Sequence, residues 1–247
     1  REYQKDDLEN NLNHFFSYQH HSDFTDENAE SALDRINSKL SDSRLFLKGC
    51  HTLFVSLGTA WSWVNKDSGQ IVNNCHKVPA SKFNFQLISS EQIINAFNST
   101  IQQLNALNPK LQVVFTVSPV RHWKNGGIEN SRSKATLLSA VHELNDSHSN
   151  VHYFPSYEIM IDDLRDYRFY QNDLLHPTDL AIQYIWNKFE IAFFDDETCN
   201  KNKAAQKVRS FMDHRPKSTS KEVHENHEIE LKLRVNHLKE DHGIELK

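Results

Sequence analysis

The sequence predicts an α/β fold, a three-layer α/β/α sandwich built around a parallel sheet. Short apolar runs alternate with longer segments of helical periodicity, and the runs are nearly continuous in their apolar character. Such runs are typical of strands buried on both faces, and their alternation with helices implies βαβ units. The chain has 247 residues, of which 38% are hydrophobic and 11% aromatic. It is therefore long enough for one large α/β domain or two small ones, and a disordered chain is excluded.

Three strands and four helices follow from the local patterns. The expected strands are 53–57, which is closed by Gly58, 111–117, which is stopped by Ser118 and Pro119, and 151–154. The expected helices carry apolar stripes at Ala29, Ala32, Leu33, Ile36 and Leu40; at Ile93, Ile94, Phe97, Ile101 and Leu104; at Leu137, Leu138, Val141 and Leu144; and at Ile182, Ile185, Trp186, Phe189 and Phe193.

Local signals also mark where these elements begin. Ser89 and Gln92 have the spacing of a capping box at the start of the helix over 90–107. Pro177 fits the first turn of the fourth helix. The segment up to about Phe24 is polar and aromatic, and it is expected to be irregular.

The composition changes at Cys199, after which charges of both signs dominate. The apolar residues there are ambiguous, since 229–235 alternate strictly while Leu231, Val235 and Leu238 recur at helical spacing. We interpret this part as a charged helix that packs by a narrow stripe, and its mixed charges favour a solvated surface over a nucleic-acid arm. The prediction is an α/β domain over 1–198 and a helical extension over 199–247.

Composition also restricts the class of protein. A formal net charge of −5 argues against a general nucleic-acid binder. The sequence contains no run of about 18 apolar residues, so no membrane span is expected. Three cysteines, Cys50, Cys75 and Cys199, are an odd number without metal-ligand spacing, which favours a reduced, cytoplasmic compartment. Because the chain opens on Arg1, with neither an initiator Met nor an apolar signal stretch, it is expected to be a cut fragment.

The ends of the three strands carry unusual side chains. Residues 58–61 and then 74–80 follow the first strand, 118–123 follow the second, and 162–177 follow the third. In open parallel sheets, functional groups gather at the carboxyl ends of the strands. Loops bearing Trp or His at three such ends are therefore expected to converge on one edge.

The segment from Asp173 to Pro177 has the most specific pattern. An aspartate and a histidine three residues apart can form a hydrogen bond within one turn, which leaves the second nitrogen of His176 free as a general base. From these few residues alone, a turn or capping role for Asp173 and a surface position for His176 explain the pattern more simply.

Taken together, these segments resemble the GSCFA-domain proteins of bacteria. The resemblance runs in order from about Tyr3 to Pro216, through the segments 20–24, 57–61, 74–80, 118–123, 164–170 and 173–177. That family is grouped with the SGNH (GDSL-like) hydrolases, whose fold is a flavodoxin-like α/β/α sandwich. The resemblance implies hydrolysis of an ester, on an acylated carbohydrate or another small polar molecule, without a cofactor, a nucleic acid or a membrane.

One departure from the family is clear. The family takes its name from a Gly-Ser-Cys-Phe-Ala stretch, which aligns with the block that carries the nucleophilic serine in SGNH enzymes, and this sequence contains no such stretch. The resemblance therefore implies an N-terminally truncated chain, whose three strands are part of a five-stranded sheet. The fragment alone is expected to be inactive.

The remaining roles follow from the resemblance. His176 would be the general base, oriented by Asp173. Gly58 aligns with the block in which SGNH enzymes place an oxyanion-binding asparagine, but the residue two positions later is Ala60, which has no side-chain donor. Asn74 or the hydroxyl of Thr59 could substitute. Arg121 and His122 could bind substrate, although Arg121 could equally pair with a carboxylate such as that of Asp166.

Three alternatives were weighed against this assignment. A thiolate at Cys75 paired with His176 is chemically possible, but a free cysteine is more often a small buried apolar residue. A metal site could draw on His14, His20, His21, Asp23, His76 and His122, but no pair has zincin spacing and none is predicted. A non-catalytic carbohydrate- or protein-binding module could use Trp61, Trp63, Trp123, Tyr167, Phe169 and Tyr170 as stacking platforms.

Overall fold

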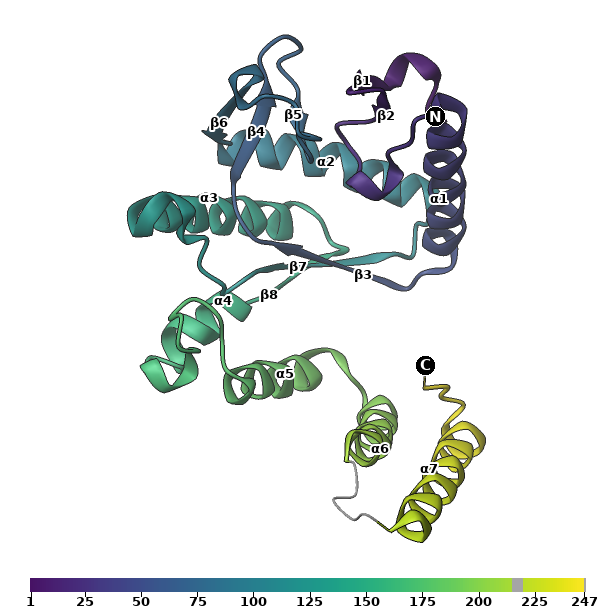
Figure 1. The fold of residues 1–247 in the computed structure, drawn as a ribbon. Helices are drawn as coiled ribbons and strands as arrows, with labels where there is room; N and C mark the ends of the chain where they lie inside the picture. Colours follow the sequence, from purple (N-terminus) through teal and green to yellow (C-terminus); the bar gives the residue numbers. More distant parts are fainter. Residues whose placement is uncertain (215–219, 247) are drawn as a thin grey trace. The chain divides into compact units, whose positions relative to one another are not determined.

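The computed structural model describes residues 1–214 and 220–246 (Figure 1). Its strands are β1 (Glu9–Asn11), β2 (His14–Phe16), β3 (Thr52–Leu57), β4 (Trp61–Asn65), β5 (Ile71–Val72), β6 (Phe83–Leu87), β7 (Gln112–Val117) and β8 (Val151–Phe154). Its α-helices are α1 (Ala29–Gly49), α2 (Ser90–Leu107), α3 (Gly126–Ser147), α4 (Ser156–Glu158), α5 (Asp179–Phe193), α6 (Asp196–Asp213) and α7 (Lys221–His242). Short 3-10 or π turns occupy Lys5–Asp7, Ser22–Phe24, Ala80–Lys82, Trp123–Asn125, Ile159–Asp163 and Tyr167–Phe169.

The three predicted strands form one parallel sheet in the order β3–β7–β8. The register pairs Thr52 with Gln112 at the start of β3, and Val113 with Val151 at the start of β8. Helices flank this sheet, so the predicted mixed α/β class is confirmed. Because all three strands run in the same direction, their carboxyl ends lie along one edge, where the predicted functional loops begin.

The main core lies between β7 and the helices α2 and α3, which cover the same face of the sheet (Figure 1). Alternate residues of β7 point into it, as expected for a strand. Its buried members are Ala60, Ile101, Leu111, Val113, Phe115, Val117, Leu137, Val141, Leu144 and Val151. The predicted capping box begins α2. The Ser89 hydroxyl accepts from the Gln92 amide at 3.2 Å, and the Gln92 side chain accepts from the Ser89 backbone amide.

A second sheet, antiparallel in the order β5–β4–β6, occupies a region for which we predicted no strands. The register pairs Trp61 with Leu87 and Trp63 with Phe85. Both pairs stand on one face, where the rings of Trp61 and Phe85 stack at 5.2 Å. The alternation of Trp61 and Trp63, and of Phe83, Phe85 and Leu87, was a period-2 signal that the prediction did not use.

The N-terminal segment, expected to be irregular, contains the antiparallel hairpin β1–β2. Its turn residues Leu12 and Asn13 have φ of 52° and 62°, the left-handed region that two-residue hairpin turns require. Such turns usually carry Asn-Gly or Asp-Gly, and neither dipeptide occurs here. The usual sequence signal for the hairpin is therefore absent.

The position predicted for Pro177 is wrong. Helix α5 begins at Asp179, two residues later, and Pro177 instead forms an isolated antiparallel bridge with Tyr170. Proline lacks the amide hydrogen that a ladder needs, but in this bridge the amides of the flanking residues Gln171 and Thr178 donate. The preference of proline for a helical first turn was therefore overridden by its pairing with a preceding segment.

The described chain separates into two compact units, Arg1–Ala181 and Ile182–Lys247, a division that lies within α5 rather than at Cys199, where the composition changes. Within the second unit, α6 and α7 pack against each other. The predicted charged C-terminal helix is confirmed as α7, and its ambiguous pattern is helical, since Leu238 is buried while Ile229 and Leu233 are exposed. Within 1–214 and 220–246, no helix combines the length and apolar character needed to cross a membrane.

Candidate active site at the strand ends

A buried lysine joins the ends of the first two parallel strands. Lys134 lies on α3 and is only 1% exposed. Its Nζ donates to the carbonyl oxygens of Gly58 at 2.7 Å and Ser118 at 2.6 Å, the residues that directly follow β3 and β7. Burial lowers the pKa of this ammonium to about 8. Lys134 was not among the predicted site residues, although it falls in phase with Leu137 and Val141 on the apolar face of its helix.

The turn after β3 is held by the residue that precedes this lysine. The amide of Ala60 donates to the Ser133 hydroxyl at 2.7 Å, and the hydroxyls of Ser133 and Thr59 lie 3.0 Å apart. The Thr59 oxygen also accepts from the Trp61 amide at 3.1 Å. The Thr59 hydroxyl, a predicted oxyanion donor, is thus engaged in holding its own turn.

His122 lies over this turn. Its backbone amide donates to the buried Asn130 side chain at 3.0 Å, and its ring packs directly against Gly58. Partial burial, and secondarily the ammonium of Lys134, lower the pKa of His122. The structure therefore brings together Gly58 and His122, which the sequence analysis had placed at the ends of two different strands.

The end of the third strand joins the same cluster. Ser156, which begins α4 after β8, donates to the Val117 carbonyl at 2.8 Å. The ring of the next residue, Tyr157, lies 5.9 Å from the Lys134 Nζ. Burial raises the pKa of Tyr157, and the positive charge of Arg121 opposes that rise. The ends of β3, β7 and β8 thus contribute to one site.

Arg121 does not pair with Asp166, the partner that the sequence left open. Its Cζ instead lies 5.1 Å from the centre of the Tyr170 ring, a cation–π contact. Asp166 caps its own turn by accepting from the Arg168 amide at 2.9 Å, and its carboxylate lies 3.7 Å from the Arg168 guanidinium.

The Asp173–His176 pair adopts the geometry that the spacing predicted. Asp173 Oδ2 lies 2.6 Å from His176 Nδ1, and Oδ1 accepts from the amides of His176 at 3.0 Å and Leu175 at 2.8 Å. The His176 amide, the His176 side chain and the Leu175 amide all lower the pKa of Asp173, to about 2. The enclosed Leu174 has a left-handed φ of 57°, so this short turn accepts backbone strain to face the carboxylate toward the imidazole.

The pair is oriented for proton transfer. Because an ionised carboxylate binds Nδ1, that nitrogen carries the hydrogen and Nε2 keeps its lone pair. Among the residues that the structure describes, none forms a hydrogen bond with His176 Nε2. Both side chains are about half exposed, at 54% for His176 and 43% for Asp173. The free nitrogen is therefore open to an incoming group.

Backbone pairing connects this dyad to the strand-end cluster. Tyr170, on which Arg121 stacks, bridges to Pro177, and the Gln171 amide donates to the His176 carbonyl at 2.8 Å. Lys134 thus lies near Tyr157, Tyr157 is close enough to Arg121 for its charge to act on it, and Arg121 stacks on Tyr170 beside the segment that holds His176.

Comparison with known proteins identifies the family to which the chain belongs. The model of the GSCFA family matches residues 1–189, which include every residue of the strand-end cluster and the dyad. The chain belongs to the GSCFA family. Among curated proteins, none matches the sequence. Helices α6 and α7 follow the matched GSCFA region.

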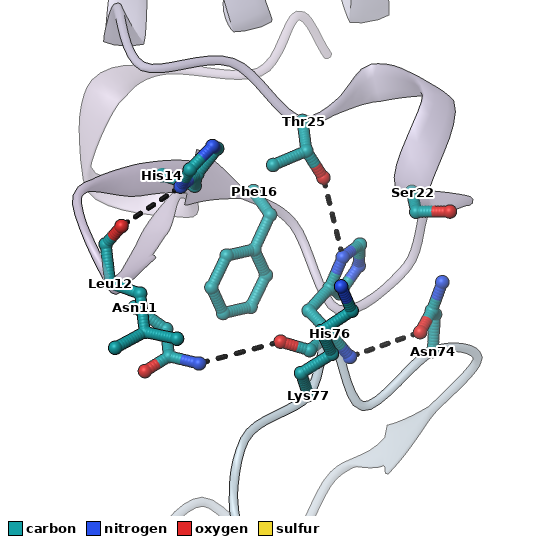
Figure 2. Close-up of a pocket in the computed structure, with 9 residues that line it drawn as sticks. All are labelled: Asn11, Leu12, His14, Phe16, Ser22, Thr25, Asn74, His76 and Lys77. Atoms are coloured by element: carbon teal, nitrogen blue, oxygen red, sulfur yellow. Dashed lines mark hydrogen bonds between the residues drawn. The ribbon is translucent and has the colours of Figure 1, made fainter.

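Within the GSCFA region, Asn74 lies in a different place from the other predicted site residues. It lines a cavity of about 500 Å³ with Asn11, Leu12, His14, Phe16, Ser22, Thr25, His76 and Lys77 (Figure 2). Its Oδ1 accepts from the His76 amide at 3.0 Å. No hydrogen bond in the described chain joins Asn74 to Gly58 or His176, and its oxyanion role stays a prediction.

The same cavity accounts for His76, which was considered as a metal ligand. Its Nε2 lies 3.0 Å from the carbonyl oxygens of both Ser17 and His20, so this nitrogen is a donor with no lone pair for a metal. Burial lowers the pKa of His76 and raises that of the neighbouring Cys75 thiol. In residues 1–214 and 220–246, no three His, Cys, Asp or Glu residues gather as metal ligands.

The contact between His122 and Gly58 makes a testable prediction. A Cβ on residue 58 would lie 2.9 Å from His122 Nε2, so Gly58→Ala must displace the ring. We expect unfolding by denaturant to show a loss of about 1–2 kcal/mol. The loss should shrink in a His122→Ala background, because the clash is with that ring.

Gly49→Ala is the matched control, since a Cβ at the end of α1 meets nothing within 4 Å. It should be neutral or slightly stabilising, because alanine favours helix over glycine. A Gly58→Ala cost that is unchanged without the His122 ring would contradict the packing described above.

Proposed function

We propose that the intact protein is an SGNH-type serine hydrolase that removes an acyl group from a carbohydrate or another small polar ester. One observation carries the proposal: the Asp173 carboxylate holds His176 Nδ1 at 2.6 Å while Nε2 stays open. This is the arrangement of base and orienting group that activates a hydroxyl nucleophile on many unrelated folds.

In this mechanism a serine hydroxyl attacks the ester carbonyl. His176 Nε2 takes the hydroxyl proton and returns it to the leaving alcohol, and the acyl-enzyme is then hydrolysed by water that His176 activates in the same way. Asp173 remains ionised throughout, since its pKa lies near 2, and it stabilises the imidazolium that forms in each step.

The nucleophilic serine is assigned to polypeptide outside residues 1–247. Two observations support this assignment. No hydroxyl in the described chain bonds His176 Nε2. In addition, β3 is an edge strand of the described parallel sheet and pairs only with β7, although Leu53, Phe54 and Val55 make it apolar. An apolar edge strand is a template for a further strand, and a strand added beside β3 would end next to the cluster.

Backbone groups are the best candidates to stabilise the oxyanion. The Thr59 hydroxyl and the Ala60 amide are both engaged with Ser133. By contrast, the amides of Gly58 and Thr59 have no hydrogen-bond acceptor among the described residues, and they directly follow β3. Main-chain donors of this kind stabilise developing negative charge without reorganisation.

The test is hydrolysis of acetyl and short acyl esters by the full-length protein and its His176→Ala variant. We expect kcat/KM to fall by about 10³-fold or more, because the variant loses the base. His152→Ala is the matched control, since His152 is also an exposed imidazole with a single side-chain partner, Gln112, at 2.9 Å. Equal activity in wild type and His176→Ala would show that the base is assigned wrongly.

A non-catalytic binding module is the alternative. Trp123 and Tyr167, at 51% and 75% exposure, could provide stacking surfaces for such a module. Trp61 and Trp63 instead pack with Phe85. The Lys124 ammonium lies over the rings of Trp63 and Phe85. Saturable sugar binding without hydrolysis by the full-length protein would favour this alternative.

A further inference from the structure

Arg121 has a positive charge that no carboxylate of the described residues pairs with. Its guanidinium lies over Tyr170, and no acidic side chain within 1–214 or 220–246 forms an ion pair with it. Arg168 provides the contrast within the same loop: it lies 5.0 Å from the centre of the Phe169 ring but also pairs with Asp166 at 3.7 Å. The stack on Tyr170 therefore holds Arg121 in place and leaves its N–H donors available.

The acidic groups near this loop are committed elsewhere. Asp162 pairs with Arg165 at 2.8 Å, and the Glu158 carboxylate accepts from the Tyr153 hydroxyl at 2.8 Å. Lys134, whose Nζ lies 5.9 Å from the Tyr157 ring, is a second cation near Arg121. Arg121 is thus the cation of this cluster that has neither a carboxylate nor a carbonyl partner among the described residues.

The position of Arg121 relative to the dyad limits how a ligand can use it. Tyr170 pairs with Pro177, and paired residues in an antiparallel bridge share one face. His176 directly precedes Pro177, so Arg121 and the imidazole reach this bridge from adjoining residues rather than from one point. An ester that reaches both groups must carry its charge several bonds away from the reacting carbonyl.

We propose that Arg121 binds a carboxylate on the alcohol part of the substrate, so that the preferred ester is that of an acidic sugar such as a uronate. This inference rests on the proposed function. A guanidinium is planar and offers parallel N–H donors that match a carboxylate, and stacking on an aromatic ring orients it in advance. One guanidinium charge also matches the single charge of a carboxylate.

The first experiment measures binding alone. Methyl glucuronoside and methyl glucoside are titrated into the chain of residues 1–247, and shift changes are followed by NMR. The glucuronoside should bind saturably and at least about 10-fold more tightly than the glucoside. Arg121→Gln should remove this preference. Arg121→Lys should reduce it, because lysine keeps the positive charge but lacks the parallel N–H donors of the guanidinium. Arg168→Gln should leave the preference unchanged.

The second experiment measures hydrolysis by the full-length protein, with the monoacetyl esters of the same two glycosides. We expect kcat/KM to favour the uronate ester about 10-fold or more, and Arg121→Gln to bring the two values together. Arg168→Gln is again the control.

The outcomes separate this inference from the proposed function. Equal binding of both glycosides, or a preference that survives in Arg121→Gln, would overturn the assignment of Arg121. Inorganic phosphate that binds more tightly than the glucuronoside would also overturn it, because the site would then select a doubly charged oxyanion. Selective glucuronoside binding, together with hydrolysis that does not depend on His176, would retain Arg121 and remove the proposed hydrolase.

Discussion

Replacing Asp173 by asparagine is expected to lower kcat/KM of the full-length hydrolase by about 10³–10⁴-fold without disturbing the fold. Asparagine keeps an Oδ1 that accepts from the amides of Leu175 and His176, so the turn is retained. The atom that faces His176 Nδ1 becomes an NH₂ donor, which favours the tautomer with the hydrogen on Nε2. The base would then present a donor where a lone pair is required.

The pH dependence of the wild type makes this prediction sharper. The pKa of Asp173 is lowered to about 2, chiefly by the hydrogen bond from the His176 amide. A depressed carboxyl pKa contributes stability that is present above the unfolded value and is lost as the pH falls through the folded value. Asp173 is therefore ionised across any practical assay range, and its titration should not appear in the activity profile above about pH 3.

Asp166→Asn is the matched control for Asp173→Asn. Asp166 is also an exposed aspartate that caps its own turn, but its side-chain partner is Arg168 rather than an imidazole. This variant should leave kcat/KM within about twofold. A similar loss of activity in both variants would show that disturbance of the loop, rather than the tautomer of His176, is the cause.

The local parts of this site could be predicted from the sequence. The Asp173–His176 contact spans three residues within one turn, so spacing and side-chain chemistry were sufficient to predict it. The capping box at Ser89 likewise follows from a short-range pattern. So does the existence of the strands β3, β7 and β8, although not the way they pair. Each depends on a pattern that can be read over fewer than about ten residues.

The tertiary parts could not be predicted in the same way. Lys134 is 76 residues from Gly58 in sequence, and only the packing of α3 beside the strand ends brings its ammonium to that carbonyl. Arg121 stacks on Tyr170, which the bridge to Pro177 holds in place, and no local pattern in the sequence predicts that contact. Asn74 was predicted as a possible oxyanion donor because its segment follows the first strand, but only the tertiary structure shows that it lines a cavity with His76 and Phe16.

The second large effect is expected at Lys134, where we predict that Lys134→Met lowers the free energy of unfolding by about 2–4 kcal/mol at pH 7. Methionine fills a similar volume but cannot donate to the carbonyls of Gly58 and Ser118. A buried ion pair can often be exchanged for apolar residues without loss of stability when both partners are replaced. Here the partners of Lys134 are backbone carbonyls, which no substitution removes, so they are left without a donor. Arg132→Ala, at a mainly exposed position two residues earlier, is the control and should cost less than about 1 kcal/mol.

The same variant makes a distinctive prediction about pH. The folded pKa of Lys134 is lowered to about 8 by burial, so between about pH 8 and 10.4 the unfolded chain binds a proton that the folded chain does not. The stability contributed by this group therefore rises with pH in that window, by up to about 1.4 kcal/mol per unit. We expect the difference in the free energy of unfolding between wild type and Lys134→Met, measured by denaturation, to be larger at pH 9.5 than at pH 7.

His122 provides an independent readout of the lysine charge. The ammonium of Lys134 contributes to the lowered pKa of His122, after the larger effect of burial. In Lys134→Met that repulsion is gone, so the pKa of His122 measured by NMR should rise, whereas in Arg132→Ala it should stay where it is. A stability loss without movement of the His122 titration would mean that the charge of Lys134 does not act on His122, contrary to the repulsion described above.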